Sequence, residues 1–174
     1  MITRSATEWM LLPLKRYAQF SGRSPRAEYW WFALFSFLIS LPAAILDVAL
    51  GLQLFNPIVS LGLLLPSIAV GVRRLHDLDR TGWWLLAPLA LLVPTLAIAG
   101  MAGAGGAIAG LLGSEAGAGA GVGSAAVVVA IGGVAVLAMA VVMLAWYCTR
   151  GTQGENRFGP DPLAEAPNPT VYYG

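Results

Sequence analysis

Long stretches without a charged residue dominate the pattern of polar and hydrophobic positions along the chain. The stretches that contain no Asp, Glu, Lys or Arg are residues 29–46, 48–72, 81–114 and 116–149. A helix needs about 20 apolar residues to cross a hydrocarbon core of about 30 Å. The pattern therefore predicts an all-α integral membrane protein with four transmembrane helices. We place these spans at residues 30–50, 57–72, 83–101 and 125–147.

The segment between the third and fourth predicted spans is mostly Gly, Ala and Ser over residues 100–123. Gly destabilises a helix by about 1 kcal/mol relative to Ala, so we predict a loop here. Three pairs in it have the small-x-x-x-small spacing that lets helices approach closely in lipid. They are Gly106/Gly110, Gly117/Gly121 and Gly119/Gly123. A chain so rich in Gly and Ala also produces such pairs by chance, and both interpretations stay open.

The first 28 residues predict a short amphipathic helix that lies in the membrane interface. Ser5 and Glu8 have the spacing of a capping box, in which each side chain accepts a hydrogen bond from the backbone of the other. Aromatic residues follow at near-helical spacing, and these are Trp9, Tyr17 and Phe20. Pro13 removes one helix hydrogen bond and is expected to break the helix in two. The segment has no apolar run long enough for a signal peptide, so we expect the first span to be retained.

The ends of the predicted spans carry capping and aromatic signals. Ser24 and Pro25 have the order of an N-cap followed by Pro at the first helical position. Pairs of aromatic residues are typical of the headgroup level of a membrane. Such pairs occur at Trp30 and Trp31, Trp83 and Trp84, and Trp146 and Tyr147. With four spans, all three pairs lie on one side of the membrane.

The positions of the basic residues predict the orientation. All ten Lys and Arg residues fall in three segments, residues 1–28, 73–80 and 150–157. Four spans place these segments on one side, which the positive-inside rule assigns to the cytoplasm. We therefore expect a multi-pass membrane protein with both termini in the cytoplasm. Its parts are an N-terminal segment (residues 1–28), a transmembrane domain (29–149) and a tail (150–174).

The amino-acid composition excludes several classes of protein and several kinds of site. Of the 174 residues, 57% are hydrophobic and 11% are charged, with a net charge of +1. A soluble domain carries about 25% charged residues. These values exclude a disordered chain, and they argue against a soluble enzyme and a nucleic-acid partner. Cys148 is the single cysteine, which excludes an intrachain disulfide and a thiolate metal site. We expect no metal and no cofactor.

Three polar motifs interrupt the apolar spans. Residues 20–31, 73–84 and 151–162 read FSGRSPRAEYWW, RRLHDLDRTGWW and GTQGENRFGPDP. In this order and spacing they resemble the small bacterial inner-membrane proteins grouped as domain of unknown function 805. The resemblance covers about residues 20–162. It implies an integral membrane protein without an assigned activity, and it supplies no catalytic residues.

The topology brings these motifs to one face of the membrane, where two interpretations compete. In the first, the basic side chains form a site for an anion such as a lipid headgroup, because Arg binds phosphate in a bidentate way. The candidates are Arg23, Arg26, Arg73, Arg74, Arg80 and Arg157. In the second, these residues only anchor the fold. A structural polar cluster is then expected from Glu28, His76, Asp77, Asn156 and Asp161.

The function most consistent with these features is non-enzymatic. We expect a binder of an anionic lipid headgroup or an accessory subunit of a membrane complex, with membrane lipids, a membrane-protein partner or a second copy as partners. An oligomeric transporter or channel is an alternative, because Asp47 is the one ionisable residue inside a predicted span. A membrane-embedded enzyme of lipid or phosphate chemistry is another, because His76 and Asp77 are adjacent. Arg73, Arg74 and Arg80 would repel a metal ion there.

Overall fold

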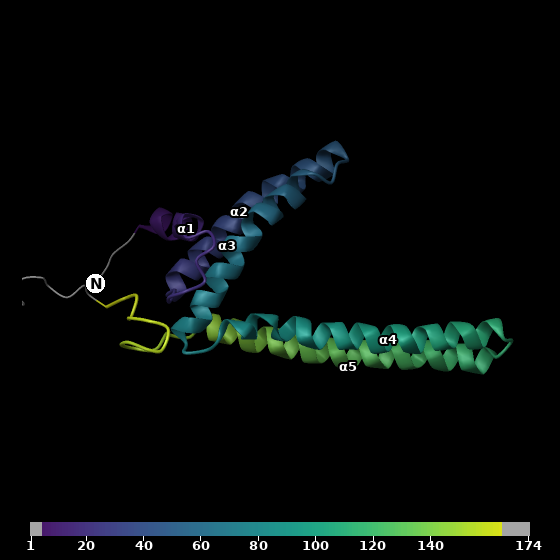
Figure 1. The fold of residues 1–174 in the computed structure, drawn as a ribbon. Helices are drawn as coiled ribbons and strands as arrows, with labels where there is room; N and C mark the ends of the chain where they lie inside the picture. Colours follow the sequence, from purple (N-terminus) through teal and green to yellow (C-terminus); the bar gives the residue numbers. More distant parts are fainter. Residues whose placement is uncertain (1–4, 165–174) are drawn as a thin grey trace, which may run out of the picture. The chain divides into compact units, whose positions relative to one another are not determined.

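The computed structural model describes residues 5–164, and all its regular elements in this range are helices (Figure 1). The helices are α1 (Ala6–Lys15), α2 (Arg26–Leu50), α3 (Phe55–Asp77), the 3-10 helix η1 (Gly82–Leu86), α4 (Ala87–Leu111) and α5 (Glu115–Cys148). Four segments are long and apolar enough to cross a membrane, namely α2, α3, η1 with α4, and α5. The predicted all-α fold with four spans is confirmed. Residues 1–4 and 165–174, which include the end of the predicted tail, lie outside the described residues.

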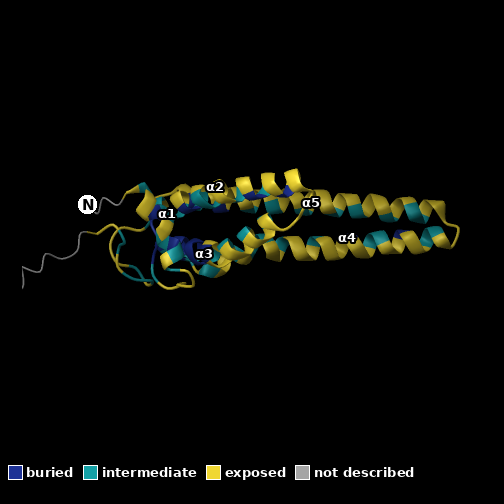
Figure 2. Ribbon diagram, turned by 90° about the horizontal axis from the view of Figure 1, so that it is seen from above, coloured by how far each residue is buried: buried dark blue, intermediate teal, exposed yellow. Residues whose placement is uncertain are grey.

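The long helices expose most of their apolar side chains (Figure 2). Leu61 is 70% exposed, Phe37 60% and Leu137 66%. Such extensive exposed apolar surface marks contact with membrane or protein. Buried residues instead gather where α1, α2 and α3 meet (Figure 2). The lateral surface of the spans is therefore suited to lipid, and specific polar contacts are concentrated at the helix ends.

The chain divides into two compact units, and each is described by itself. The first contains α1, α2, α3, residues up to Leu85 and residues from Trp146 onward. The second comprises Leu86–Ala145, which is the hairpin of α4 and α5. Within the first unit, α1 packs on both α2 and α3. The candidate site residues all belong to this first unit.

The N-terminal helix forms as predicted, with one difference. Glu8 N donates to Ser5 Oγ at 3.3 Å and Ser5 N donates to Glu8 Oε2 at 2.8 Å, which confirms the capping box. The helix continues through Pro13, so the expected break is wrong. Trp9 and Pro13 are the buried residues of α1, and Tyr17 Oη donates to Gly62 O at 2.7 Å beyond the helix end. Packing on α2 and α3 supports the helix across the position where proline removes a hydrogen bond.

The start of α2 differs from the prediction by one residue. The helix begins at Arg26, and Pro25 is the N-cap with an extended backbone (φ −69°, ψ 160°). Ser24 is wholly buried, and its Oγ has no hydrogen-bond partner among the described residues. Its N–H donates to Arg73 O at 3.0 Å. This bond to α3 fixes Ser24 outside the helix, so α2 starts without a side-chain cap.

Asp47 joins the other ends of α2 and α3. The carboxylate accepts hydrogen bonds from Leu54 N at 3.0 Å, Phe55 N at 2.9 Å and Asn56 N at 2.8 Å. These donors are the free N–H groups at the start of α3, where the helix dipole also favours a negative charge. The transporter alternative rested on this acid. The structure gives Asp47 a structural role, because it caps α3.

The Gly/Ala tract is helical, and the predicted loop over residues 100–123 is wrong. Only Leu112, Gly113 and Ser114 separate α4 from α5. Gly113 adopts a φ of +83°, and Ser114 Oγ accepts a hydrogen bond from Gly117 N at 3.1 Å at the start of α5. A chain in lipid must satisfy its backbone groups internally, and a helix does so at every residue. That requirement outweighs the low helix propensity of Gly.

Close packing in the hairpin explains two of the three glycine pairs. A Cβ on Gly106 would lie 2.8 Å from the Cα of Gly121, and a Cβ on Gly117 would lie 2.7 Å from the Cβ of Ala109. A Cβ on Gly110 would lie 3.2 Å from the Cβ of Ala118. The pairs Gly106/Gly110 and Gly117/Gly121 thus form the seam between α4 and α5. Gly119 and Gly123 have nothing within 4 Å, so the third pair has no such role in the described residues.

Candidate anion-binding site

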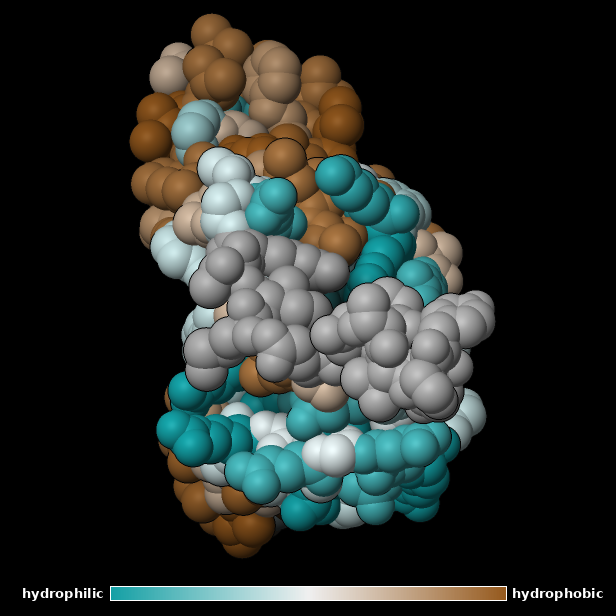
Figure 3. Space-filling model, turned by 90° about the vertical axis from the view of Figure 1, so that its left-hand side faces the viewer, coloured by the Kyte–Doolittle hydropathy of each residue, from teal (hydrophilic) through white to brown (hydrophobic). Residues whose placement is uncertain are grey.

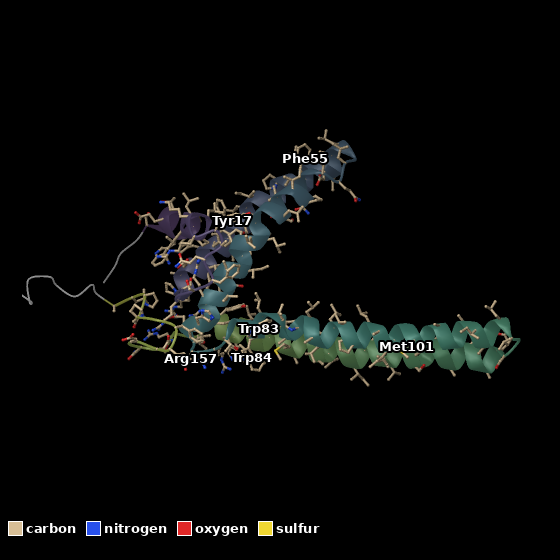
Figure 4. All side chains as sticks on the ribbon, in the orientation of Figure 1. Tyr17, Phe55, Trp83, Trp84, Met101 and Arg157 are labelled. Atoms are coloured by element: carbon tan, nitrogen blue, oxygen red, sulfur yellow. The ribbon has the colours of Figure 1, made fainter. Side chains whose placement is uncertain are left out.

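Three polar segments meet at one end of the first unit. We call this region the polar end; it comprises residues 16–28, 73–80 and 149–163. Figure 3 faces this end and shows hydrophilic residues gathered on it. Arg157 lies in this region, and Trp83 and Trp84 of η1 lie beside it (Figure 4). The ring of Trp84 packs on Trp146 with centroids 5.3 Å apart, so two of the predicted aromatic pairs meet at this level.

A buried ion pair ties α2 to α3. Arg73 Nη2 and Glu28 Oε1 are 2.9 Å apart, and the two side chains are 0% and 1% exposed. Arg73 Nη1 also donates to Gln19 O at 2.7 Å, on the segment that follows α1. Arg16 lies 4.0 Å from the other oxygen of Glu28. Arg73 therefore connects all three elements, and its guanidinium is enclosed by protein.

A second buried cluster is built around Asp77 at the end of α3. Arg23 Nε donates to Asp77 Oδ1 at 3.0 Å, and Arg74 Nη1 donates to Asp77 Oδ2 at 2.6 Å. Arg74 further donates to the carbonyls of Trp146, Tyr147 and Thr149 at the end of α5. A cation is favourable there, because the last carbonyls of a helix carry partial negative charge. The cluster thus holds the ends of α3 and α5 together.

The tail crosses the polar end as a docked strap, residues 150–161. Arg23 donates to the carbonyls of Thr152, Gly154 and Gly159. Thr152 N donates to Asp77 O at 2.8 Å. A Cβ on Gly151 would overlap the Asp77 carboxylate, so only glycine allows the strap to pass so close. The third polar motif therefore forms part of the fold at this end.

His76 and Asn156 fasten the strap to the end of α3. Asn156 Nδ2 donates to His76 O at 2.9 Å. The His76 ring stacks on Phe158 with centroids 4.0 Å apart, and its Nδ1 lies 3.1 Å from Gly22 O. The enzyme alternative rested on His76 and Asp77. Both side chains are engaged in contacts that hold the polar end together.

The remaining candidates lie nearer the surface. Arg157 pairs with Asp79 at 3.0 Å, and both side chains are about half exposed. The guanidinium of Arg80 lies 3.9 Å from the ring centroid of Trp146. Asp161 accepts hydrogen bonds from Gly154 N at 3.2 Å and Leu163 N at 2.9 Å. The structure thus brings every candidate to the polar end and engages all of them except Arg26.

Arg26 lines a cleft at the start of α2, which we call the Arg26 cleft. Its volume is about 570 Å³. The lining residues are Pro25, Arg26, Asp77, Arg150, Gly151, Thr152, Gln153, Asp161 and Leu163. Arg26 and Arg150 are exposed, and neither makes a hydrogen bond or ion pair within residues 5–164. The uncapped first turn of α2 adds free N–H groups, so the cleft gathers three sources of positive potential.

Arg150 was not among the residues selected from the sequence. It directly precedes the third polar motif and follows the fourth predicted span by three residues. That position could have identified Arg150 as a candidate, because a basic residue at the end of a span lies near the lipid headgroups. Gln153 and Thr152 reach the cleft through the same strap.

An apolar groove of about 400 Å³ adjoins the cleft. It is lined by Arg26, Ala27, Trp30, Trp31 and Leu34 along the first turns of α2. Arg26 belongs to both cavities. A molecule seated at Arg26 can therefore place a polar group in the cleft and an apolar chain in the groove.

Comparison with known proteins supports a membrane family. The sequence model of the family described as "Protein of unknown function (DUF805)" matches residues 17–160. The chain is 30% identical to the inner membrane protein YhaI of Escherichia coli K12, over 89% of this chain and 95% of that one. It is also 30% identical to the inner membrane protein YhaH of the same strain, over 91% and 98%. No solved structure matches. With its four apolar helices, this chain is a multi-pass inner-membrane protein, and it belongs to the DUF805 family.

Proposed function

We propose that the protein binds the anionic headgroup of a membrane phospholipid in the Arg26 cleft. One observation carries the proposal: Arg26 is shared by a polar cleft and an apolar groove at the same helix end. A phospholipid has this division between an anionic headgroup and apolar chains. Basic pockets between transmembrane helices suit such headgroups.

The charge of the cleft supports an anion. Asp77 is already paired with Arg23 and Arg74, so its negative charge is compensated within the fold. The cleft and the residues paired with Asp77 together contain four arginines and two carboxylates. The carboxylates are those of Asp77 and Asp161. Arg26 and Arg150 supply the free guanidinium groups. Arg is well suited to phosphate because its planar fork donates two parallel hydrogen bonds.

The position of the groove along α2 favours a lipid over a soluble anion as the ligand. Trp30 and Trp31 lie one turn into α2, where aromatic side chains are typical of the headgroup level. Leu34 continues the groove one turn further toward the apolar part of the span. A bound phosphate at Arg26 would thus have its glycerol and acyl chains beside these residues.

Exchanging both free arginines tests the proposal. We expect Arg26→Gln with Arg150→Gln to lower the retention of anionic phospholipid about tenfold, measured by native mass spectrometry after gentle purification. A hydrogen bond to a charged group contributes about 1.5–3 kcal/mol, and 1.4 kcal/mol corresponds to a factor of ten. Arg157→Gln is the matched control, because Arg157 lies outside the cleft and pairs with Asp79. Unchanged lipid in the double variant would contradict the proposal.

We also propose that the polar end faces the cytoplasm, which places the cleft in the inner leaflet. All ten Lys and Arg fall in residues 1–28, 73–80 and 150–157 of the sequence, and none falls between α2 and α3 or between α4 and α5. A reporter that is active only outside the cytoplasm should be active when inserted at Glu115 and inactive when fused at Gly174. The opposite pattern would contradict the orientation.

A further inference from the structure

We infer that the Arg26 cleft is built for a headgroup that carries hydroxyl groups beside its phosphate, as a phosphoglycerol headgroup does. The inference rests on the proposed function and names the class of lipid. It follows from the size of the cleft and from the distribution of hydrogen-bonding groups on its walls. Neither feature is needed to bind a bare phosphate.

The cleft is larger than a phosphate group. Its volume is about 570 Å³. One water molecule occupies about 30 Å³ in the liquid, so a phosphate of five heavy atoms fills a minor part of this space. The remainder has room for a headgroup with further polar atoms beyond the phosphate.

Acceptors on the strap face this remaining space. Gln153 lines the cleft, and its amide makes no hydrogen bond within the described residues. Each carboxylate oxygen of Asp161 accepts one backbone N–H, whereas a carboxylate offers about four acceptor positions. Asp161 therefore keeps capacity for a further donor. Hydroxyl groups are donors that these acceptors can bind while Arg26 and Arg150 hold the phosphate.

Other common headgroups match this arrangement less well. A bare phosphate monoester has no hydroxyl chain to reach Gln153 and Asp161, and its second negative charge lies close to Asp161. An ammonium headgroup brings a positive charge to a cleft in which arginines outnumber carboxylates by two, with Arg23 and Arg74 included. A quaternary ammonium has no donor for either acceptor. A phosphodiester headgroup with hydroxyl groups, such as phosphoglycerol, pairs a single negative charge with the donors that Gln153 and Asp161 can bind.

The exchange Gln153→Ala tests the inference in the full-length protein. We measure binding of phosphatidylglycerol and phosphatidic acid in nanodiscs with a phosphatidylcholine background. The wild type should prefer phosphatidylglycerol, and Gln153→Ala should reduce this preference about fivefold, because a hydrogen bond contributes about 1 kcal/mol. Binding of phosphatidic acid should not change. Gln53→Ala is the matched control, since Gln53 is an exposed residue of the turn between α2 and α3.

Each other outcome has a distinct meaning. Equal binding of the two lipids by the wild type, or the same preference in Gln153→Ala, would overturn the inference and leave the proposed function intact. If the protein bound neither anionic lipid more strongly than phosphatidylcholine, the proposed function itself would be overturned. Soluble glycerol phosphate is added as a competitor. Displacement of the lipid at equal concentration would show that the ligand is a soluble phosphate, which contradicts the role of the apolar groove.

Discussion

The variant Asp77→Asn should lose about 3–5 kcal/mol of unfolding free energy, because it leaves two buried arginines without their shared carboxylate. Arg23 and Arg74 are almost completely buried and both pair with Asp77. The loss should be measured by equilibrium unfolding in mixed detergent micelles. It should also loosen the strap at Arg23, because Asp77 fixes the position from which Arg23 donates to the tail carbonyls.

The control for this exchange is Asp79→Asn. Asp79 pairs with Arg157 at a similar distance, but both side chains are about half exposed. A surface ion pair contributes about 0–1 kcal/mol, so this variant should unfold almost like the wild type. Equal losses for both variants would refute the structural role that we assign to the buried cluster.

The variant Gly121→Ala should destabilise the hairpin of α4 and α5 by about 2–3 kcal/mol. The added Cβ would overlap the backbone of Gly106, which cannot move away as a flexible side chain can. Overpacking of this kind costs about 1–3 kcal/mol. Thermal unfolding in detergent, followed by circular dichroism, measures the change.

Gly119→Ala gives the matched comparison, because it makes the same chemical change two residues away on α5. Gly119 has nothing within 4 Å, so its Cβ would enter open space. The higher helix propensity of Ala then predicts a gain of about 1 kcal/mol. The two variants should therefore shift stability in opposite directions. Stabilisation by both would show that the seam at Gly106 and Gly121 is not close-packed.

The four spans could be predicted because charged residues are so costly in lipid that their absence marks each helix. The bounds were less predictable, since α5 contains 34 residues and continues well beyond the ~20 that a bilayer requires. The loop prediction failed because it used the propensity of single glycines. Close contact between Gly106 and Gly121 depends on two helices at once, and the actual turn was signalled by Gly113 and Ser114.

At the polar end, too, one part of the structure could be predicted from the sequence and another could not. Topology alone was enough to bring the three motifs together, because it places them on one side of the membrane. The pairing of individual arginines could not be predicted, since Arg73 and Arg74 are neighbours in sequence but bind different carboxylates, Glu28 and Asp77. Only these contacts distinguish the arginines that hold the fold from Arg26, which remains available for a ligand.

An experimental structure of the wild type in a lipid phase that contains phosphatidylglycerol tests the central claim most directly. The account predicts phosphate density within hydrogen-bond distance of Arg26 and Arg150, with an acyl chain along Trp30 and Leu34. Density for a headgroup at other positions, with the Arg26 cleft filled only by water, would contradict it.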